Sequence, residues 1–363
     1  MSVAPEPGFV HGTAAKTAVL LCNLGTPDAP TPAAVRRYLA QFLSDPRVVE
    51  IPRLFWLPIL HGVILRVRPA RSARKYASIW TPDGSPLKVW TEKQALLLRG
   101  YLGQRGHPVT VRHAMRYGQP SIASALDTLK ADGVDRVLIL PLYPQYASST
   151  TASVGDAVSA WAKNVRNVPE LRFVKHYHDE PGYIGALAKR IDDHWMMVGR
   201  PDKLVLSFHG LPRRSLTLGD PYHCECLKTG RLLAERLKLR EGMMVVTFQS
   251  RFGKAEWLKP YTAPTLLALA QAGARVDVMC PGFAVDCLET LQEIDQEARA
   301  AFLGAGGKEF SYVPCLNDQH EGIAALAGIA IRHMQGWDAV PADAGAEALA
   351  QQRQRAIAAG APD

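Results

Sequence analysis

Eight short apolar runs rich in β-branched residues recur along the chain, and they constrain the fold more than any other feature. They span residues 17–24, 109–115, 136–142, 172–177, 203–208, 244–248, 275–280 and 310–315. Runs of this length predict buried strands, and helical stretches such as residues 121–131 and 229–239 lie between most of them. This alternation predicts an α/β fold whose parallel sheets are covered on both faces.

The strands fall into two groups of four, which predicts two lobes. In the second group, successive strands begin roughly 30 to 40 residues apart, the length of a βαβ unit. We therefore expect two Rossmann-like, doubly wound lobes, residues 17–165 and 166–336, each with a four-stranded parallel sheet and with a cleft between them. An insertion at about residues 50–90 is expected to form a lip, because long insertions usually carry function. The tail, residues 337–363, is expected to be frayed or helical.

The net charge limits the classes of partner. The formal charge of +8 and the pI near 9.2 would suit nucleic acid, an anionic membrane surface or an acidic small molecule. The chain has no zinc-finger or helix-turn-helix spacing, and no alternation of aromatic and basic residues that would stack bases. We therefore expect no nucleic-acid partner.

The N-terminus and the cysteines indicate a reducing compartment. Residues 1–21 lack the basic region, apolar run and cleavage site of a signal peptide, so we expect a cytoplasmic protein. Six irregularly spaced cysteines do not resemble a disulfide framework, and reduced thiols are expected. The most apolar stretch, residues 54–65, is about half of the ~20 residues that cross a bilayer and contains Pro58 and Gly62. It can touch a membrane but cannot span one.

Polar and Gly/Pro-rich motifs follow the predicted strands directly. They are NLGTPDAP from Asn23, MRYGQP from Met115, PLYPQY from Pro141, SFHGLP from Ser207, FQSRFG from Phe248 and CPGFAVD from Cys280. In open α/β sheets, ligands bind outside the carboxyl ends of the strands. We therefore expect all six motifs to face one cleft.

His209 is the first candidate for chemistry. It follows the run KLVLSF and precedes Gly210 and Pro212, so its side chain is expected to be fixed at a strand end. An imidazole there can bind a metal ion or act as a base near neutral pH. A lone histidine is more often a core residue hydrogen-bonded to a carbonyl group, and the residues alone leave that alternative open.

A row of carboxylates is the second candidate. Glu289, Glu293 and Glu297 recur every four residues within VDCLETLQEIDQE, which on an α-helix places them on one face. Like charges at this spacing disfavour a helix, whereas the helix dipole favours a carboxylate in the first turn. The row is either a solvated face or a path for hydrated cations or protons toward a buried site, with Glu289 at the inner end.

Further residues are compatible with a ligand site without requiring one. Aromatic rings can wall a flat apolar ligand, and arginines can clamp its carboxylates. Residues of these types are Arg116, Tyr117, Tyr143, Tyr146, Trp257, and a basic cluster of Arg66, Arg68, Arg71, Arg74 and Lys75. Each alone is more often packing or surface. Cys224 and Cys226 form a C-x-C beside His223, but this is not zinc-ribbon spacing, and structural or incidental thiols are favoured.

The motifs together resemble the ferrochelatase family, from about residue 17 to residue 336. The segments that carry the resemblance are LLCNLGTPDAP, YASIWTPDGSPLKVWTEKQ, MRYGQPSI, LPLYPQYASSTTAS, LSFHGLPRRSLTLGDPY and PGFAVDCLETLQEID, in the family's order. The resemblance implies chelatase-like lobes around a porphyrin cleft. It also implies the reaction: Fe²⁺ enters protoporphyrin IX, two pyrrole protons leave, and protohaem forms in the last step of haem biosynthesis.

The resemblance implies roles for individual residues. His209 takes the place of the family's active-site histidine and Glu289 that of its active-site glutamate, so both are expected to be catalytic and to contact the metal. Glu293 and Glu297 continue what resembles the family's acidic row. The residues that fall where the family lines the porphyrin pocket are Leu24, Tyr76, Arg116, Tyr143, Gln249 and Trp257. We favour His209 as proton acceptor and Glu289 as its partner in iron delivery and proton removal, with the reverse assignment open.

The sequence departs from the family pattern in three places. Cys287 stands where some relatives carry a second histidine, which puts in doubt any iron path that needs that ligand. Leu24 replaces a methionine of relatives such as the animal enzyme. The animal enzyme's iron-sulfur cluster needs a cysteine-rich tail, and none is present in this sequence. We therefore expect no iron-sulfur cluster and no tightly bound cofactor, with Fe²⁺ as a substrate.

The expected partners are protoporphyrin and ferrous iron. The segment LFWLPILHGVIL followed by RVRPARSARK resembles the family's lip, and its apolar and basic residues suit a peripheral contact with the inner face of an anionic membrane. Rival functions are a coproporphyrin ferrochelatase, a chelatase inserting cobalt or nickel into a related tetrapyrrole, and a non-catalytic haem or metal carrier. Nothing in the periodicity marks a subunit interface, so a monomer is the default.

Overall fold

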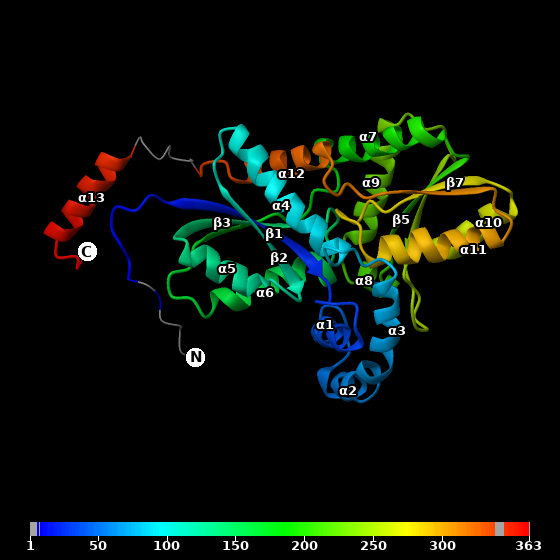
Figure 1. The fold of residues 1–363 in the computed structure, drawn as a ribbon, viewed down its shortest axis with the longest axis horizontal. Helices are drawn as coiled ribbons and strands as arrows, with labels where there is room; N and C mark the ends of the chain where they lie inside the picture. Colours follow the sequence, from blue (N-terminus) through cyan, green and yellow to red (C-terminus); the bar gives the residue numbers. More distant parts are fainter. Residues whose placement is uncertain (1–5, 7, 338–344, 363) are drawn as a thin grey trace.

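The eight predicted strands form two separate parallel sheets. The structure is a computed structural model that describes residue 6 and residues 8–337 and 345–362. The strands are β1 (Lys16–Gly25), β2 (Thr110–Tyr117), β3 (Val134–Pro141) and β4 (Glu170–Phe173) in the first sheet, and β5 (Lys203–His209), β6 (Met244–Gln249), β7 (Arg275–Met279) and β8 (Glu309–Val313) in the second. The sheets occupy the two halves of an elongated molecule (Figure 1). This arrangement confirms the predicted two-lobed α/β fold.

Both sheets have the same strand order. The first runs β2-β1-β3-β4 and the second β6-β5-β7-β8, with every neighbouring pair parallel. The central strands β1 and β5 are each flanked on both sides, so their carboxyl ends lie between loops from neighbouring strands. Because β4 pairs with β3, the first sheet extends to Phe173, past residue 165 where the sequence pattern places the end of the first lobe.

Helices cover the sheets. Those of the first half are α1 (Pro32–Ser44), α2 (Arg53–Ile59), η1 (Leu60–Ile64), α3 (Leu65–Ala77), α4 (Pro86–Gln104), α5 (Ile122–Ala131), η2 (Ser148–Ala152) and α6 (Ser153–Ala162). Those of the second half are α7 (Pro181–Val198), α8 (Arg213–Thr217), α9 (Tyr222–Arg236), α10 (Thr262–Gln271), η3 (Leu288–Ala298), α11 (Arg299–Gly304), α12 (His320–His333) and α13 (Ala346–Ala358). The η elements are π-helices. Side-chain caps start some helices, as where Ser121 Oγ accepts a hydrogen bond from Ser124 N at the start of α5.

One hydrophobic cluster joins the two lobes. It includes Val19 and Leu140 of the first sheet and Leu206 of the second, all fully buried, together with residues of α7 and α12. Helix α12 packs against α7 and also against α4, which belongs to the first half of the chain. The lobes therefore share a core instead of meeting only at polar surfaces.

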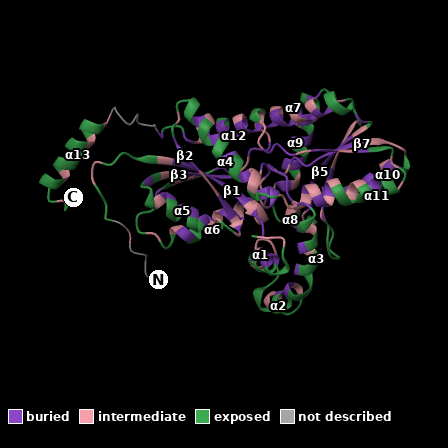
Figure 2. Cartoon of the chain, in the orientation of Figure 1, coloured by how far each residue is buried: buried purple, intermediate pink, exposed green. Residues whose placement is uncertain are grey.

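The predicted lip is a helical insertion between β1 and β2. Helices α1 to α3 project from one side of the molecule (Figure 1), and α2 is largely exposed (Figure 2). Leu54 and Phe55 of α2 are 81% and 66% exposed, and Val63 and Val67 farther along the lip are also exposed. None of the helices in residues 8–337 and 345–362 has the length and apolar character needed to cross a bilayer.

The predicted tail is described only in part. Residues 338–344 and 363 lie outside the described residues, and the part between them contains α13, which buries none of its side chains.

Candidate active site

His209 is held at the carboxyl end of β5 with one ring nitrogen left open. It pairs with Gln249 of β6, and Gly210 N donates a hydrogen bond to Gln249 O at 2.8 Å. A Cβ on Gly210 would come within 2.5 Å of that oxygen, so only glycine fits there. His209 Nδ1 lies 2.7 Å from Gly210 O, and because a carbonyl oxygen only accepts, Nδ1 carries the proton. The neutral ring then has a free lone pair on Nε2.

Gln249 connects the strand of His209 to the helix of Glu289. Its Nε2 donates to the backbone oxygen of Glu289 at 2.9 Å, and its Oε1 accepts from Ser207 Oγ at 2.7 Å and from Cys280 Sγ at 3.6 Å. The side chain is buried and both ends of its amide are occupied. Gln249 therefore fixes the position of Glu289, a different role from the predicted pocket lining, which stays a prediction.

The carboxylate row lies on the π-helix η3, where the sequence pattern predicts an α-helix. The Cys287 side chain accepts from Thr290 N, and Thr290 Oγ1 accepts from Cys287 N at 2.9 Å, so the two residues form the start of η3. Wide π turns use i→i+5 hydrogen bonds and are frequent at functional sites. Periodicity does not distinguish them, because a four-residue spacing falls near one turn of either helix.

The three glutamates of the row have different surroundings. Glu293 accepts hydrogen bonds from Ser250 N at 2.8 Å and from Ser250 Oγ at 2.6 Å. Glu297 forms an ion pair with Lys75 of α3 at 2.9 Å. The outer two carboxylates are thus engaged with protein partners, and Lys75 is turned toward η3 instead of the solvated face predicted for the basic cluster.

Glu289 faces buried groups of low polarity. Burial raises the pKa of the Cys287 thiol well above its ordinary value, and the nearby Glu289 carboxylate adds to the rise. Burial likewise raises the pKa of Tyr76 on α3, with Tyr38 and Glu289 adding to the effect. The Tyr76 and Tyr38 rings meet edge to face, 6.4 Å between centroids. The first lobe therefore brings two neutral phenols to the Glu289 carboxylate.

Leu24 and Trp257 supply apolar surface near these groups. Leu24 follows Asn23 near the end of β1. It packs against a cluster that contains Cys287 and, like Leu288, against the cluster that contains Tyr76. Trp257 is buried, and its ring lies 3.1 Å from the position a Gly210 Cβ would take, beside the chain of His209. Both predicted wall residues therefore lie beside the two predicted catalytic residues.

Arg116 is held by protein groups. Its NH2 forms an ion pair with Asp45 at 2.7 Å, and its Nε donates to Ser153 O at 2.9 Å and to Ser153 Oγ. Burial would raise the pKa of Asp45, but hydrogen bonds from Ser153 and Tyr117 and the charge of Arg116 lower it. A guanidinium already paired in this way is a weaker candidate for clamping a ligand carboxylate, and its porphyrin contact stays a prediction.

Tyr143 has a buried hydroxyl group for which the described part of the chain provides no hydrogen-bond partner. Burial raises its pKa well above the ordinary value, with Tyr117 and Cys22 adding to the rise, so the phenol stays protonated. An unpartnered buried donor is uncommon in proteins. Its assignment to the porphyrin pocket remains a prediction.

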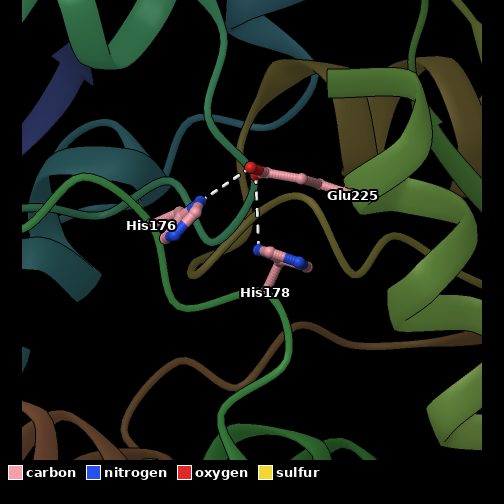
Figure 3. A group of neighbouring side chains, drawn as sticks. All are labelled: His176, His178 and Glu225. Carbon is pink, nitrogen blue, oxygen red and sulfur yellow. Dashed lines mark hydrogen bonds and ion pairs between the residues drawn. The ribbon is translucent and has the colours of Figure 1, made fainter. Parts of the chain in front are cut away.

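A cluster that the sequence arguments missed lies between the lobes. His176 and His178 follow β4, Glu225 belongs to α9, and their ligand-type atoms lie within 4.8 Å of one another (Figure 3). The H-x-H in KHYHDE was the available signal, but nothing in the sequence pairs it with a glutamate about fifty residues later. The C-x-C motif, which the sequence analysis weighed as a metal site, lies on either side of Glu225. Its Cys224 is exposed and its Cys226 is buried.

Comparisons with known proteins agree on one family. The family model described as Ferrochelatase matches residues 16–334. The ferrochelatase of Methylibium petroleiphilum is 72% identical over 338 residues, covering 93% of both chains, and that of Polaromonas sp. is 66% identical over 368 residues, covering 100% of both. The solved structure of SirB from Bacillus subtilis with Fe³⁺ has a TM-score of 0.55 at 13% identity, covering 89% of this chain and 97% of that chain, a likeness of fold alone. The chain belongs to the ferrochelatase family.

Proposed function

We propose that this chain inserts Fe²⁺ into protoporphyrin IX to give protohaem, with His209 accepting pyrrole protons and Glu289 acting with it in iron delivery and proton removal. The ferrochelatase family inserts iron into porphyrin. The balance of the reaction is one Fe²⁺ in and two pyrrole protons out, with no change in oxidation state. The site must therefore supply proton acceptors and a route for the cation.

The observation that carries the proposal is the contact between His209 Nδ1 and the Gly210 carbonyl, which selects the tautomer of the ring. The Gly210 carbonyl fixes the proton on Nδ1 and leaves the Nε2 lone pair available. A general base needs a lone pair held in position at neutral pH, and imidazole has an ordinary pKa in that range. His209 meets this requirement without any rearrangement of its ring.

Glu289 is suited to the partner role because its neighbours are neutral. The raised pKa values of Cys287 and Tyr76 keep both groups protonated at neutral pH. Glu289 is then the anionic group of this surface, so it attracts a cation that sheds water or a proton that leaves the ring. Cys287 as a thiol is a poor metal ligand, because thiolates bind metals. The iron route therefore depends on the carboxylate.

The apolar residues would provide the binding energy. A porphyrin exposes its nitrogen lone pairs when it is bent, and contacts with the rest of the macrocycle can offset the cost of bending. Leu24, Tyr76 and Trp257 offer such contacts next to the two polar groups. We assign these three residues to the porphyrin walls.

The decisive experiment is an anaerobic assay of the purified chain with Fe²⁺ and either protoporphyrin or coproporphyrin, followed by the absorbance change on metallation. Turnover with protoporphyrin is expected, and faster turnover with coproporphyrin would replace the proposed substrate. His209→Ala is expected to lower kcat by about 10²–10⁴-fold, the usual range for a general base, while porphyrin binding measured by fluorescence persists. A carrier would bind porphyrin and be little affected by the substitution.

We also propose that the lip makes a peripheral contact with the cytoplasmic face of a membrane. Support comes from the exposed apolar side chains of α2 together with the exposed Arg66, Arg68 and Arg71 of α3. Apolar side chains that insert at the headgroup level and cations that attract anionic lipids act together in such contacts. A contact of this kind would place the cleft where a poorly soluble porphyrin can reach it.

A further inference from the structure

His176, His178 and Glu225 converge from two different segments of the chain. The histidines lie in the connection from β4 to α7, and Glu225 is in the first turn of α9. His176 Nδ1 lies 2.7 Å from Glu225 Oε1, and His178 Nδ1 lies 3.3 Å from Glu225 Oε2. The dashed lines in Figure 3 mark the ion pairs that join each ring to the carboxylate. None of the three residues belongs to the predicted active site.

The orientation of His178 does not fit a simple hydrogen bond. The residue is 5% exposed, and its Nδ1 is buried with no hydrogen-bond partner among the described residues, although a carboxylate oxygen is only 3.3 Å away. Its ring and the carboxylate are therefore close but not aimed at each other. Two ligands of one metal ion have this relationship, because each directs its lone pair at the ion between them.

Neighbouring groups prepare the three side chains for a cation. Asp179 Oδ2, held by Lys228 Nζ at 2.6 Å, lies 3.9 Å from His178 Nε2, on the side of the ring away from Glu225. A carboxylate near the other nitrogen of a histidine is the usual support of a metal ligand.

Glu225 is also fixed from the first lobe. Tyr146 N donates to Glu225 Oε2 at 2.7 Å, and a carboxylate has lone pairs left for further contacts. The residue is buried. The carboxylate is thus fixed by the backbone of one lobe while its own helix belongs to the other.

We propose that His176, His178 and Glu225 bind one divalent transition-metal ion of the zinc type, which ties the β4–α7 connection to α9. Two imidazoles and a carboxylate are donors that suit Zn²⁺ and its neighbours and do not suit Mg²⁺ or Ca²⁺, which require oxygen ligands. The His176 side chain is 39% exposed, so an ion can enter from solvent and keep a water as fourth ligand. This ion is bound by the protein and is distinct from the iron that the enzyme transfers.

The test separates this site from the active site by working in a His209→Ala/Glu289→Gln background. Untagged full-length protein is stripped of metal and titrated with Co²⁺, followed by visible absorption, and with Zn²⁺, followed by calorimetry. One equivalent is expected, with a Co²⁺ spectrum of four-coordinate N/O type and a rise in Tm with Zn²⁺. A tenfold excess of Mg²⁺ is expected not to compete.

His176→Ala removes a proposed ligand that is half-exposed, so it leaves no large cavity in the core. Glu225→Gln removes the charge of the proposed carboxylate ligand but keeps the shape of the side chain. Each is expected to weaken Co²⁺ binding at least tenfold and to abolish the Zn²⁺-dependent rise in Tm. His320→Ala, which removes an exposed histidine beside Tyr101, is the matched control and is expected to bind as the background protein does. The proposal is wrong if the background protein takes up no Co²⁺, or if all three variants bind it equally.

Discussion

The two lobes have the same strand order, but the central strand of each ends in a different side chain. On β2, Met115 N donates to Pro120 O at 2.7 Å, and Met115 pairs with Asn23, the residue before Leu24. On β6, Phe248 N donates to Pro260 O at 2.9 Å, and Phe248 pairs with Phe208, the residue before His209. Leu24 in LGTP and His209 in HGLP therefore occupy equivalent positions. The same backbone arrangement ends in an apolar side chain in the first lobe and in an imidazole in the second.

The π-helices η2 and η3 also differ between the two lobes. Each lobe has one soon after its third strand, and η2 has five residues whereas η3 has eleven. The short helix carries hydroxyl groups, and the long one carries the carboxylate row Glu289, Glu293 and Glu297. Of these two helices, only η3 carries charged side chains.

The largest expected effect concerns Glu289, the second residue of η3. Glu289→Gln keeps the shape of the side chain but removes its charge and its capacity to accept a proton, and kcat is expected to fall about 10²-fold or more. Ser149→Ala, at the equivalent position of η2, is expected to change kcat by less than about threefold, since it removes no charge. Steady-state metallation rates measure kcat for both variants. Equal losses of kcat would contradict the proposed role of the Glu289 carboxylate.

The next largest effects are expected at Arg116 and Gln249, which follow Met115 and Phe248 in the sequence. Arg116→Ala leaves the buried Asp45 carboxylate without its cation and is expected to lower the free energy of unfolding by about 3 kcal/mol. Gln249→Ala breaks three hydrogen bonds at a cost of about 1–3 kcal/mol.

These two variants should differ more in kinetics than in stability. Gln249→Ala is expected to lower kcat at unchanged KM, because Gln249 supports the backbone of Glu289. Urea unfolding and steady-state kinetics on the same preparations test this. A larger loss of kcat for Arg116→Ala would assign that arginine to the chemistry.

A smaller effect is expected at the lip, which only the first lobe has. Phe55→Asp is expected to weaken binding to anionic vesicles by about tenfold, because burial of a Phe side chain contributes about 1.5–3 kcal/mol. Met196→Asp is the control, since Met196 on α7 of the second lobe is 77% exposed. Vesicle co-sedimentation measures both. If the two substitutions act alike, the lip has no special affinity for the membrane.

The smallest effect concerns Asp277, a buried acid in the second sheet. Asp277 of β7 accepts from Trp195 Nε1 at 2.7 Å, and burial raises its pKa to about 6. The native state thus binds this proton more tightly than the unfolded chain does. The resulting stability is complete below the ordinary Asp pKa of 3.8 and is lost as pH rises through about 6.

Asp277→Asn keeps the acceptor for Trp195 and removes the titration. We expect its Tm at pH 7 to rise by about 2–4 °C, the shift that ~1 kcal/mol produces in domains of this size, with little gain at pH 4. Calorimetry at the two pH values tests this. A gain of equal size at pH 4 would show that Asp277 does not titrate in this range.

The positions of the strands were predictable because each depends on a run of residues that are adjacent in the sequence. All eight strands form within a few residues of their predicted ends, since burial on both faces of a parallel sheet leaves a continuous apolar pattern, although the edge strand β4 has no buried residue. His209 could be placed at a strand end from KLVLSF and the glycine after it, and its tautomer follows from that same glycine's carbonyl.

The unpredicted features depend on pairings between distant segments. Lys75 meets Glu297, Arg116 meets Asp45, and Glu225 meets the histidines that follow β4. No periodicity encodes such contacts, because they arise only when helices from different parts of the chain pack together. The π-helix was missed for another reason: a wide turn and an α-turn place residues four apart on nearly the same side.

The apolar cluster shared by the two sheets limits how the enzyme can release its product. Rigid-body hinge motion between lobes is easy when they meet through a small polar interface. Here Val19 and Leu206 belong to one buried cluster and α12 packs on helices from both halves, so swinging the lobes apart would expose that core to water. The buried residues of the projecting helices α1 to α3 belong to a separate cluster, so these helices do not contribute to the core that joins the lobes.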